Sequence, residues 1–251
     1  MDNLQTIYSL PQEAEKNDLS LFENLYNKIR EKEERIYSDE QLAMLPSIHQ
    51  NHPHFGEWKI REHSSKQILR YLKNLDRELN ILEVGCGNGW LSAAIAGITQ
   101  GNVTGIDINR SELEQAMRVF GKKDNLRFLY GDIRSGFLND EVYDTIVFAA
   151  SIQYFPSLTD ILNAALKHLS PGGEIHLMDS HLYKKNELPS AKLRTREYYE
   201  TLGYPEMTMH YFHHCIEDLS SFNYKILYNP SFIHRRLLGN KSPFYHICIK
   251  A

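Results

Sequence analysis

The stretch Ile81-Leu82-Glu83-Val84-Gly85-Cys86-Gly87-Asn88-Gly89-Trp90 decides the fold of this 251-residue chain. An apolar strand runs directly into three alternate glycines, and the helix-forming run 91–96 follows at once. Glycines permit a sharp turn and a close approach of the backbone to a ligand, and the N-terminus of the next helix offers free N–H groups to an anion. The stretch therefore predicts a strand, a turn and a helix that bind a nucleotide-containing cofactor.

The spacing of these glycines separates two kinds of cofactor. A dinucleotide fingerprint, G-x-G-x-x-G, needs a third glycine at position 90, where this chain has Trp90. The pattern E-x-G-x-G-x-G, which begins at Glu83, instead resembles motif I of the class I S-adenosylmethionine (SAM)-dependent methyltransferases. The resemblance implies that the turn holds the methionyl end of SAM and that Glu83 lies near its ammonium group. The residues of the turn are Gly85, Cys86, Gly87, Asn88 and Gly89.

Two acidic residues at suitable distances support this interpretation. Asp107 follows a short apolar strand about 20 residues after the glycines, and its carboxylate can accept hydrogen bonds from both hydroxyls of a ribose. Asp132 follows the next strand and resembles the family residue that accepts a hydrogen bond from the adenine amine. By the same resemblance, Ile108 and Ile133 pack on the adenine ring, although apolar residues at strand ends usually belong to the core.

Further elements of the family pattern follow in order. Residues 143–151 resemble its fourth strand and the loop after it, and residues 169–177 resemble its fifth strand. Ser151 and Tyr154 occupy the loop in which the family places groups next to cofactor and substrate. Alternating strands and helices predict a parallel, doubly wound sheet. The resemblance, which is tight over residues 79–179, implies a seven-stranded, mostly parallel α/β fold whose last strand enters antiparallel between its neighbours.

The flanks of this core have predicted roles of their own. Residues 1–78 carry apolar residues at near-helical spacing among charged ones, which predicts a helical N-terminal cap with a break at 51–56. Residues 79–251 then form the SAM-binding domain. An insertion near 180–240 is expected to act as a lid, and the cap and this insertion together are expected to enclose the acceptor.

Composition restricts location and partners. The formal charge of −4 and the pI near 6.3 give no electrostatic reason to expect nucleic acid as a partner. No apolar run approaches the ~18 residues of a membrane helix, and the N-terminus lacks the pattern of a signal peptide, so we expect a cytoplasmic protein. Its three scattered cysteines have no metal-type spacing, and we expect no metal.

Catalytic residues are harder to identify, because in-line methyl transfer depends mainly on alignment and on a dry site. Tyr154 and His210 are the candidates, with His210 as a base that titrates near neutrality. The histidine groups 49–54 and 210–214 are alternatively structural or exposed. A metal pair of His210 and His214 requires that this segment be an α-helix.

Arg61 precedes the first core strand and is a candidate for the mouth of the cofactor site. Its planar guanidinium can bind a carboxylate of SAM or of the substrate. The alternative is an ordinary exposed arginine at the start of a helix.

The sequence thus predicts a SAM-dependent methyltransferase that acts on oxygen, nitrogen or carbon of a small organic molecule. After the fourth strand the chain lacks both the Asn/Asp-Pro-Pro-Tyr/Phe sequence of amino-directed nucleic-acid methyltransferases and a Pro-Cys pair for covalent catalysis on pyrimidines. Abundant tyrosines in the insertion suit an aromatic acceptor or plain packing. The alternatives are a protein or RNA methyltransferase, which needs an open basic rim, and a SAM-binding regulatory subunit without turnover.

Overall fold

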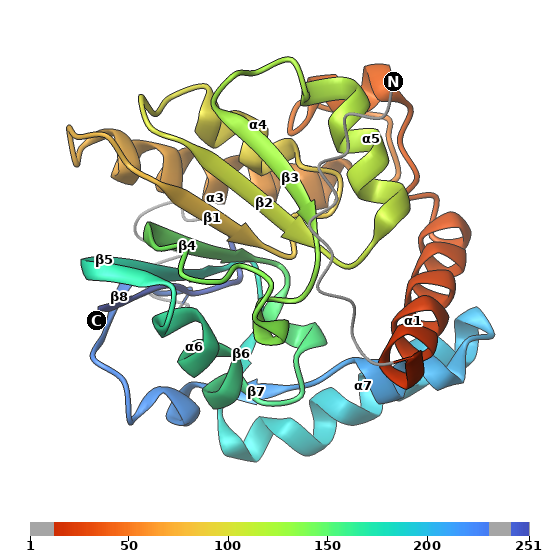
Figure 1. Cartoon of the computed structure of the whole chain (residues 1–251). Helices are drawn as coiled ribbons and strands as arrows, with labels where there is room; N and C mark the ends of the chain where they lie inside the picture. Colours follow the sequence, from red (N-terminus) through yellow and green to blue (C-terminus); the bar gives the residue numbers. More distant parts are fainter. Residues whose placement is uncertain (1–12, 231–241, 251) are drawn as a thin grey trace.

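The computed structural model describes residues 13–230 and 242–250, which form an α/β protein with helices on both faces of a seven-stranded sheet (Figure 1). None of the helices in these ranges is long and apolar enough to cross a membrane. The helices are α1 (Glu13–Lys32), α2 (Asp39–Met44), α3 (Phe55–Lys73), α4 (Trp90–Ala96), α5 (Arg110–Phe120), α6 (Leu158–Leu166) and α7 (Leu188–Leu202). The strands of the main sheet are β1 (Ile81–Val84), β2 (Val103–Asp107), β3 (Leu126–Tyr130), β4 (Tyr143–Ala149), β5 (Leu169–Met178), β8 (Tyr224–Tyr228) and β9 (His246–Lys250). A second, small sheet pairs β6 (Leu182–Tyr183) with β7 (His214–Cys215).

The main sheet has the strand order β3-β2-β1-β4-β5-β9-β8. Strands β1 to β5 are parallel, and β9 runs antiparallel to both β5 and β8. The expected seven-stranded, mostly parallel sheet is therefore confirmed, including the antiparallel entry of the last strand. The chain reverses its direction of winding between β1 and β4, and in open α/β sheets ligands bind at the carboxyl ends of the strands beside such a point.

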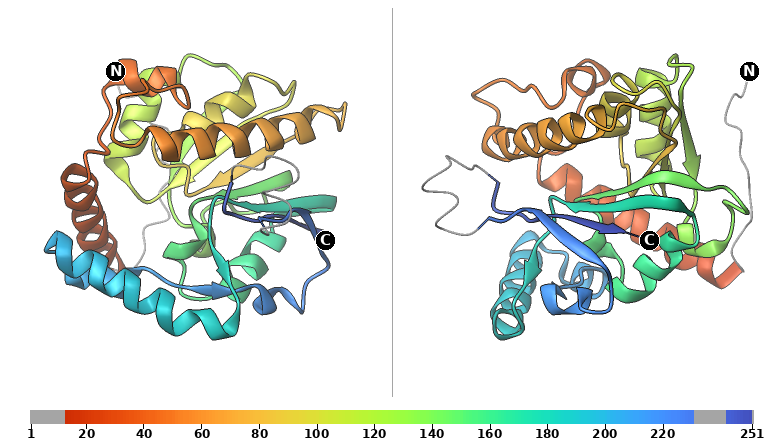
Figure 2. Two further views of the ribbon diagram at one scale, coloured as in Figure 1. Left: turned by 180° about the vertical axis from the view of Figure 1, so that it is seen from behind. Right: turned by 90° about the vertical axis from the view of Figure 1, so that its left-hand side faces the viewer.

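Alternating side chains of the strands build two hydrophobic cores, one on each face of the sheet. On one face, Leu82 of β1 packs in a cluster with Ile161 of α6. On the other face, Ile81 belongs to a cluster with Ile68 of α3 and Ile95 of α4. Figure 2 shows α3 and α6 on opposite sides of the sheet. Both cores hold the carboxyl ends of the strands in fixed positions.

Trp90, which stands where a dinucleotide fingerprint has glycine, is the first residue of α4 and is buried. Its ring packs edge-on against Trp58 of α3, with the centroids 5.4 Å apart. The indole N–H of Trp58 donates a hydrogen bond of 2.7 Å to the hydroxyl of Tyr37. These aromatic contacts attach the N-terminal helices to the glycine turn.

A third, smaller cluster joins α1 to the region after β5. Ile29 of α1, Tyr199 of α7 and Met207 of the 3-10 helix η4 (Pro205–His210) are buried together. The hydroxyl of Tyr198 also donates a hydrogen bond to Glu33 at the end of α1. Helices α1 and α7 consequently lie side by side (Figure 1). Tyr154, from the loop after β4, packs against the same cluster, which brings these helices to the carboxyl edge of the sheet.

The N-terminal segment contains α1, α2 and α3, in agreement with the helices expected there, and the predicted break is present between α2 and α3 but ends two residues earlier than expected. Helix α3 begins at Phe55, inside the expected break 51–56. Residues 1–12 of the predicted cap and 231–240 of the predicted insertion lie outside the described residues. The division into a cap of residues 1–78 and a domain of residues 79–251 stays a prediction.

Candidate functional site

The turn between β1 and α4 brings the backbone close to its neighbours at the carboxyl edge. Gly85, Gly87 and Gly89 have φ angles of +73°, +52° and +74°. A Cβ on Gly85 would lie 2.5 Å from the Cβ of Ser151, and one on Gly89 would lie 2.5 Å from the ring of Phe128. Left-handed backbone and lack of space both require glycine at these two positions.

Asp107 ends β2 directly beside this turn. Its Oδ2 accepts a hydrogen bond of 2.7 Å from the N–H of Gly87, and its Oδ1 accepts one of 2.8 Å from the N–H of Asn109. Burial raises the pKa of this carboxyl, while the backbone hydrogen bonds oppose the rise. The two bonds fix the carboxylate and leave lone pairs on both oxygens, an arrangement that suits the two hydroxyls of a ribose.

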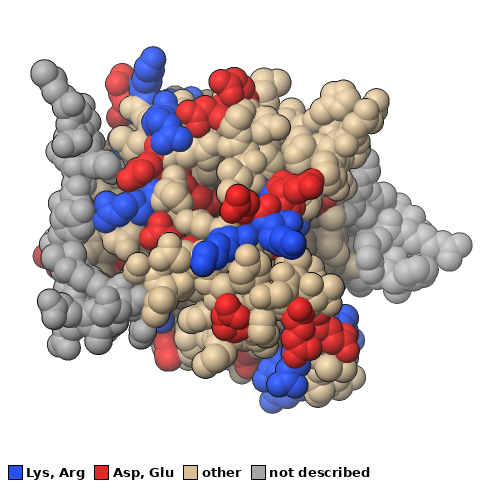
Figure 3. Space-filling view, turned by 90° about the vertical axis from the view of Figure 1, so that its right-hand side faces the viewer, with Lys and Arg blue, Asp and Glu red and all other residues tan. Residues whose placement is uncertain are grey.

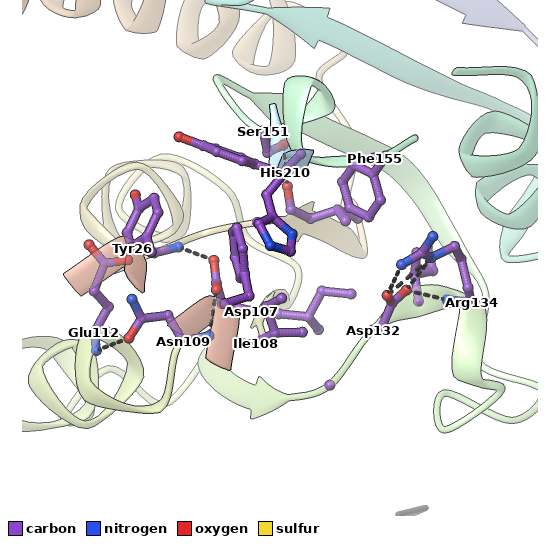
Figure 4. A pocket seen from close by; sticks show the side chains of 18 of the residues that line it. Tyr26, Asp107, Ile108, Asn109, Glu112, Asp132, Arg134, Ser151, Phe155 and His210 are labelled. Carbon is purple, nitrogen blue, oxygen red and sulfur yellow. Dashed lines mark hydrogen bonds and ion pairs between the residues drawn. The ribbon is translucent and has the colours of Figure 1, made fainter. Parts of the chain in front are cut away.

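A cavity of about 440 Å³ opens between the glycine turn, Asp107 and the loop after β4 (Figure 4). Ile108 and Ile133 both line it. Ile133 is only 2% exposed and also belongs to the core, while its contact with an adenine ring stays a prediction. The other apolar and aromatic lining residues include Phe22, Tyr26, Ile106, Tyr154, Phe155 and Phe212. We call this space the apolar cavity.

Asp132 lines the apolar cavity but already has a charged partner. Nε of Arg134 lies 3.0 Å from each carboxylate oxygen, and its Nη2 lies 2.5 Å from Oδ2 (Figure 4). The guanidinium also lies over the ring of Phe155, 5.3 Å from its centroid. The sequence interpretation of Asp132 did not include this ion pair. An adenine amine at this position must share the carboxylate with Arg134.

Glu83 lies on β1 and is 3% exposed. Its carboxyl accepts a hydrogen bond from the hydroxyl of Ser92 on α4. Burial raises the pKa of Glu83 to about 8; the bond from Ser92 opposes this rise and the charge of Asp107 adds to it. A cation that binds nearby favours the ionised form, so this buried acid suits the predicted place beside an ammonium group.

A smaller, polar cavity of about 90 Å³ adjoins the apolar cavity, and Gly85 and Gly87 line both. Asn88 and the buried Cys86 line the polar cavity as well. Four of the five predicted turn residues therefore line a cavity, and Gly85 and Gly87 lie between the polar and the apolar space, whereas Gly89 lines neither. Such a division matches a ligand with one charged and one apolar part.

Arg61 lines the polar cavity from the first half of α3. Its Nη2 pairs with Oε1 of Glu57 at 3.0 Å, and its guanidinium lies 5.5 Å from the ring centroid of Trp58. Arg30 of α1 and Arg35 line the same cavity. Three guanidinium groups beside the glycine turn make a suitable site for a carboxylate.

Glu112 of α5 lines both cavities and was not identified from the sequence. Its Oε2 lies 3.2 Å from the place that a Cβ on Gly87 would take. Burial raises the pKa of Glu112 to about 7; Asp107 adds to the rise and Arg30 opposes it. Its sequence signal is modest, an acidic residue in the first turn of the helix that follows Asp107.

The loop after β4 carries Ser151 and Tyr154, which both line the apolar cavity. Ser151 is 4% exposed, and its hydroxyl donates a hydrogen bond of 2.7 Å to the carbonyl of Val84. This bond ties the end of β1 to the loop after β4. The ring of Tyr154 packs edge-on against Tyr26 of α1 and Tyr211, so it serves packing as well as lining.

His210 is the last residue of η4 and lines the apolar cavity, with its ring 5.3 Å from that of Phe22 on α1. Figure 4 shows its imidazole among the cavity side chains. His214 is buried in β7, and its Nε2 lies 2.9 Å from the carbonyl of Ile152. Because η4 ends at His210, the two histidines do not share one face of an α-helix, which the metal pair considered above requires.

Of the two roles considered for the tyrosines of the insertion, an aromatic acceptor site and plain packing, the structure favours packing. None of these tyrosines is among the described residues that line the two cavities. Tyr199 and Tyr211 instead pack in the cluster between α1 and α7. Phe22 and Tyr26 of α1 supply aromatic lining in their place, and their i, i+4 spacing is the signal in the sequence. The five tyrosines of the insertion are Tyr183, Tyr198, Tyr199, Tyr204 and Tyr211.

Comparisons with known proteins identify a methyltransferase domain in this chain. Residues 81–173 match the family model of a methyltransferase domain, which identifies this segment. The malonyl-[acyl-carrier protein] O-methyltransferase 2 of Ilyobacter polytropus is 27% identical over 117 residues, which cover 46% of this chain and 45% of the relative. The protein-L-isoaspartate O-methyltransferase of Pyrococcus horikoshii is 33% identical over 113 residues, which cover 44% and 51%. The chain thus spans about half the length of these curated relatives.

Among solved structures, the magnesium protoporphyrin IX methyltransferase of Synechocystis PCC 6803, determined with bound S-adenosylhomocysteine, superposes with a TM-score of 0.56. The likeness covers 92% of this chain and 97% of that one, at 15% sequence identity. The shared fold therefore extends well beyond the matched domain on both sides.

Proposed function

We propose that this chain, whose residues 81–173 match a methyltransferase domain, belongs to the class I SAM-dependent superfamily and transfers the methyl group of SAM to a small organic acceptor. The observation that carries the proposal is the pair of adjoining cavities that meet at the glycine turn. SAM likewise has two different parts. One is an adenosine, whose flat adenine ring packs on apolar side chains, and the other is a charged amino-acid end. The residues present therefore fit this cofactor.

Each part of SAM has residues suited to hold it. The carboxylate of Asp107 is oriented for the ribose hydroxyls, and Ile108 lies beside it in the apolar cavity. The polar cavity offers Arg61 and its neighbouring guanidinium groups to the carboxylate, and the buried Glu83 to the ammonium group. Asp132, shared with Arg134, is available for the adenine amine.

SAM supplies a methyl group on a sulfonium, which is already activated for displacement. The chain's own part is to align the acceptor and to exclude water. Phe22 of α1 and Phe212, which follows η4, line the apolar cavity. These two apolar side chains help to exclude water from it. His210 has an imidazole within the same cavity and can take a proton from an acceptor that arrives protonated.

Several features support a small acceptor rather than a polymer. The apolar cavity is covered by α1 and η4, whose side chains Phe22 and His210 are in contact. Arg134 is the only Lys or Arg among its described lining residues, and Asp132 neutralises it. On the face in Figure 3, basic and acidic side chains are interspersed and do not form a continuous basic surface. A polymer substrate needs an open and basic rim.

The test is methyl transfer from SAM with a radioactive methyl group to a cell extract divided into small molecules, protein and RNA. We expect label in the small-molecule fraction with the native chain. The Asp107→Asn variant should transfer much less label at limiting SAM, whereas Asp140→Asn, at an exposed aspartate away from the cavities, should resemble the native chain. Label confined to protein or RNA would overturn the small-molecule acceptor, and no label in any fraction would favour a binding subunit without turnover.

A further inference from the structure

A cluster of buried polar side chains lies on one face of the sheet, on strands β5 and β9, apart from the two cavities. Glu174 and His176 of β5 stand on the same face of the sheet because they are two residues apart, and Cys248 of β9 is the register partner of His176. His176 is 0% exposed, Cys248 is 1% exposed and Glu174 is 8% exposed. One side-chain N, O or S atom from each of the three lies within 4.8 Å of the others.

The imidazole of His176 has a close partner at one nitrogen and only a longer contact, with Glu174, at the other. Its Nδ1 lies 3.0 Å from Nε2 of His246. Its Nε2 is buried and has no hydrogen-bond partner within the part of the chain that the structure describes. This nitrogen lies 3.5 Å from Oε2 of Glu174 and points into the cluster. A buried polar atom without a partner is costly, and such an atom in a native structure calls for a ligand or another explanation.

The carboxylate of Glu174 is fixed on both of its oxygens. Its Oε2 accepts a hydrogen bond of 2.5 Å from the hydroxyl of Tyr71 on α3, and its Oε1 pairs with Nζ of Lys250 at 3.0 Å. The ring of Tyr71 also packs edge-on against His176, with the centroids 4.9 Å apart. Outer partners that orient a histidine and a carboxylate in this way are usual around metal ligands.

We propose that Nε2 of His176, a carboxylate oxygen of Glu174 and the thiolate of Cys248 bind one divalent transition metal ion of the zinc type. Imidazole, carboxylate and thiolate are the three ligand types that zinc takes in proteins. Bonds of about 2.0–2.2 Å in a tetrahedral arrangement place neighbouring N and O ligands roughly 3.4 Å apart, close to the observed N···O spacing of 3.5 Å. The two anionic ligands balance the charge of the ion.

The site is structural in this interpretation and independent of methyl transfer. Glu174 pairs with Thr145 of β4, whereas Ala149 at the other end of β4 lines the polar cavity, and Ala150, which follows β4, lines both cavities. The ion joins β5 to β9, the C-terminal strand. It thereby stabilises the part of the sheet where an antiparallel strand is inserted.

The test uses untagged full-length chain that is freed of metal with a chelator and then titrated with Co²⁺ and, separately, with Zn²⁺. We expect one Co²⁺ per chain, with the near-ultraviolet charge-transfer absorption of a cobalt–thiolate bond, and a rise in melting temperature with Zn²⁺. Cys248→Ser should abolish that absorption. Cys215→Ser, which changes another buried cysteine outside the cluster, should retain it.

A measurement on the native chain alone keeps the proposal testable even where Cys248→Ser does not fold. X-ray absorption of the zinc-loaded chain should show one sulfur at about 2.3 Å and lighter ligands at about 2.0–2.2 Å. A first shell without sulfur, a stoichiometry near zero, or an unchanged cobalt–thiolate band in Cys248→Ser would each overturn the site.

Discussion

Replacement of Glu112 by Gln tests the electrostatics of the cavities. Burial raises the pKa of this carboxyl from an ordinary 4.5 to about 7. Between these two values the folded chain keeps a proton that the unfolded chain has lost, so the free energy of unfolding falls as pH rises through the interval. At ~1.4 kcal/mol per pKa unit, the whole effect is about 3 kcal/mol, and roughly 2 kcal/mol of it falls between pH 5 and pH 8.

Gln does not titrate in this range. The free energy of unfolding of Glu112→Gln, relative to that of the native chain, should therefore increase by roughly 2 kcal/mol as pH rises from 5 to 8. Urea unfolding followed by circular dichroism at several pH values measures this difference. Burial also raises the pKa values of Glu83 and Asp179, so these groups lower the free energy of unfolding with rising pH in both proteins. The difference between variant and native chain removes their contribution. Glu114→Gln, at an exposed position of the same helix, is the control. Parallel curves for Glu112→Gln and the native chain would refute the reasoning.

Three further predictions concern the site itself. Asp107→Asn should weaken S-adenosylhomocysteine binding by about 10- to 150-fold, because a hydrogen bond to a charged group contributes ~1.5–3 kcal/mol; calorimetry that finds native affinity would exclude its ribose role. Gly85→Ala should lower the melting temperature more than Gly172→Ala does, since both have positive φ but only the first places a Cβ 2.5 Å from another side chain; an equal loss would count against the clash. His210→Gln should lower the rate of methyl transfer and leave S-adenosylhomocysteine affinity unchanged, and an unaltered rate would remove His210 from proton transfer.

The part of the site around the glycine turn could be predicted because its geometry is local. Glycines at the end of β1 and an acid at the end of β2 lie close together in any parallel sheet with adjacent strands, so Gly85 and Asp107 were identifiable from spacing alone. The ion pair between Asp132 and Arg134 was missed, although the two residues are close in sequence. Whether a flexible arginine folds back on an acid depends on the aromatic ring of Phe155 beneath it.

The covering half of the site could not be predicted, because it depends on contacts between distant segments. Phe22 of α1 meets His210 of η4 only through the packing of α1 against α7. The cluster of His176 and Cys248 has the same origin, since it exists only in the antiparallel register of β5 and β9. Cysteine spacing, from which we expected no metal, carries no information on such a register.

Isothermal titration of the purified chain with S-adenosylhomocysteine, and separately with NAD, tests the central claim that the joined cavities at the glycine turn form a SAM site. The account predicts binding of one S-adenosylhomocysteine per chain and no heat of binding with NAD, because Trp90 stands where a dinucleotide site needs glycine. Equal affinity for NAD, or no binding of S-adenosylhomocysteine at millimolar concentration, would contradict it.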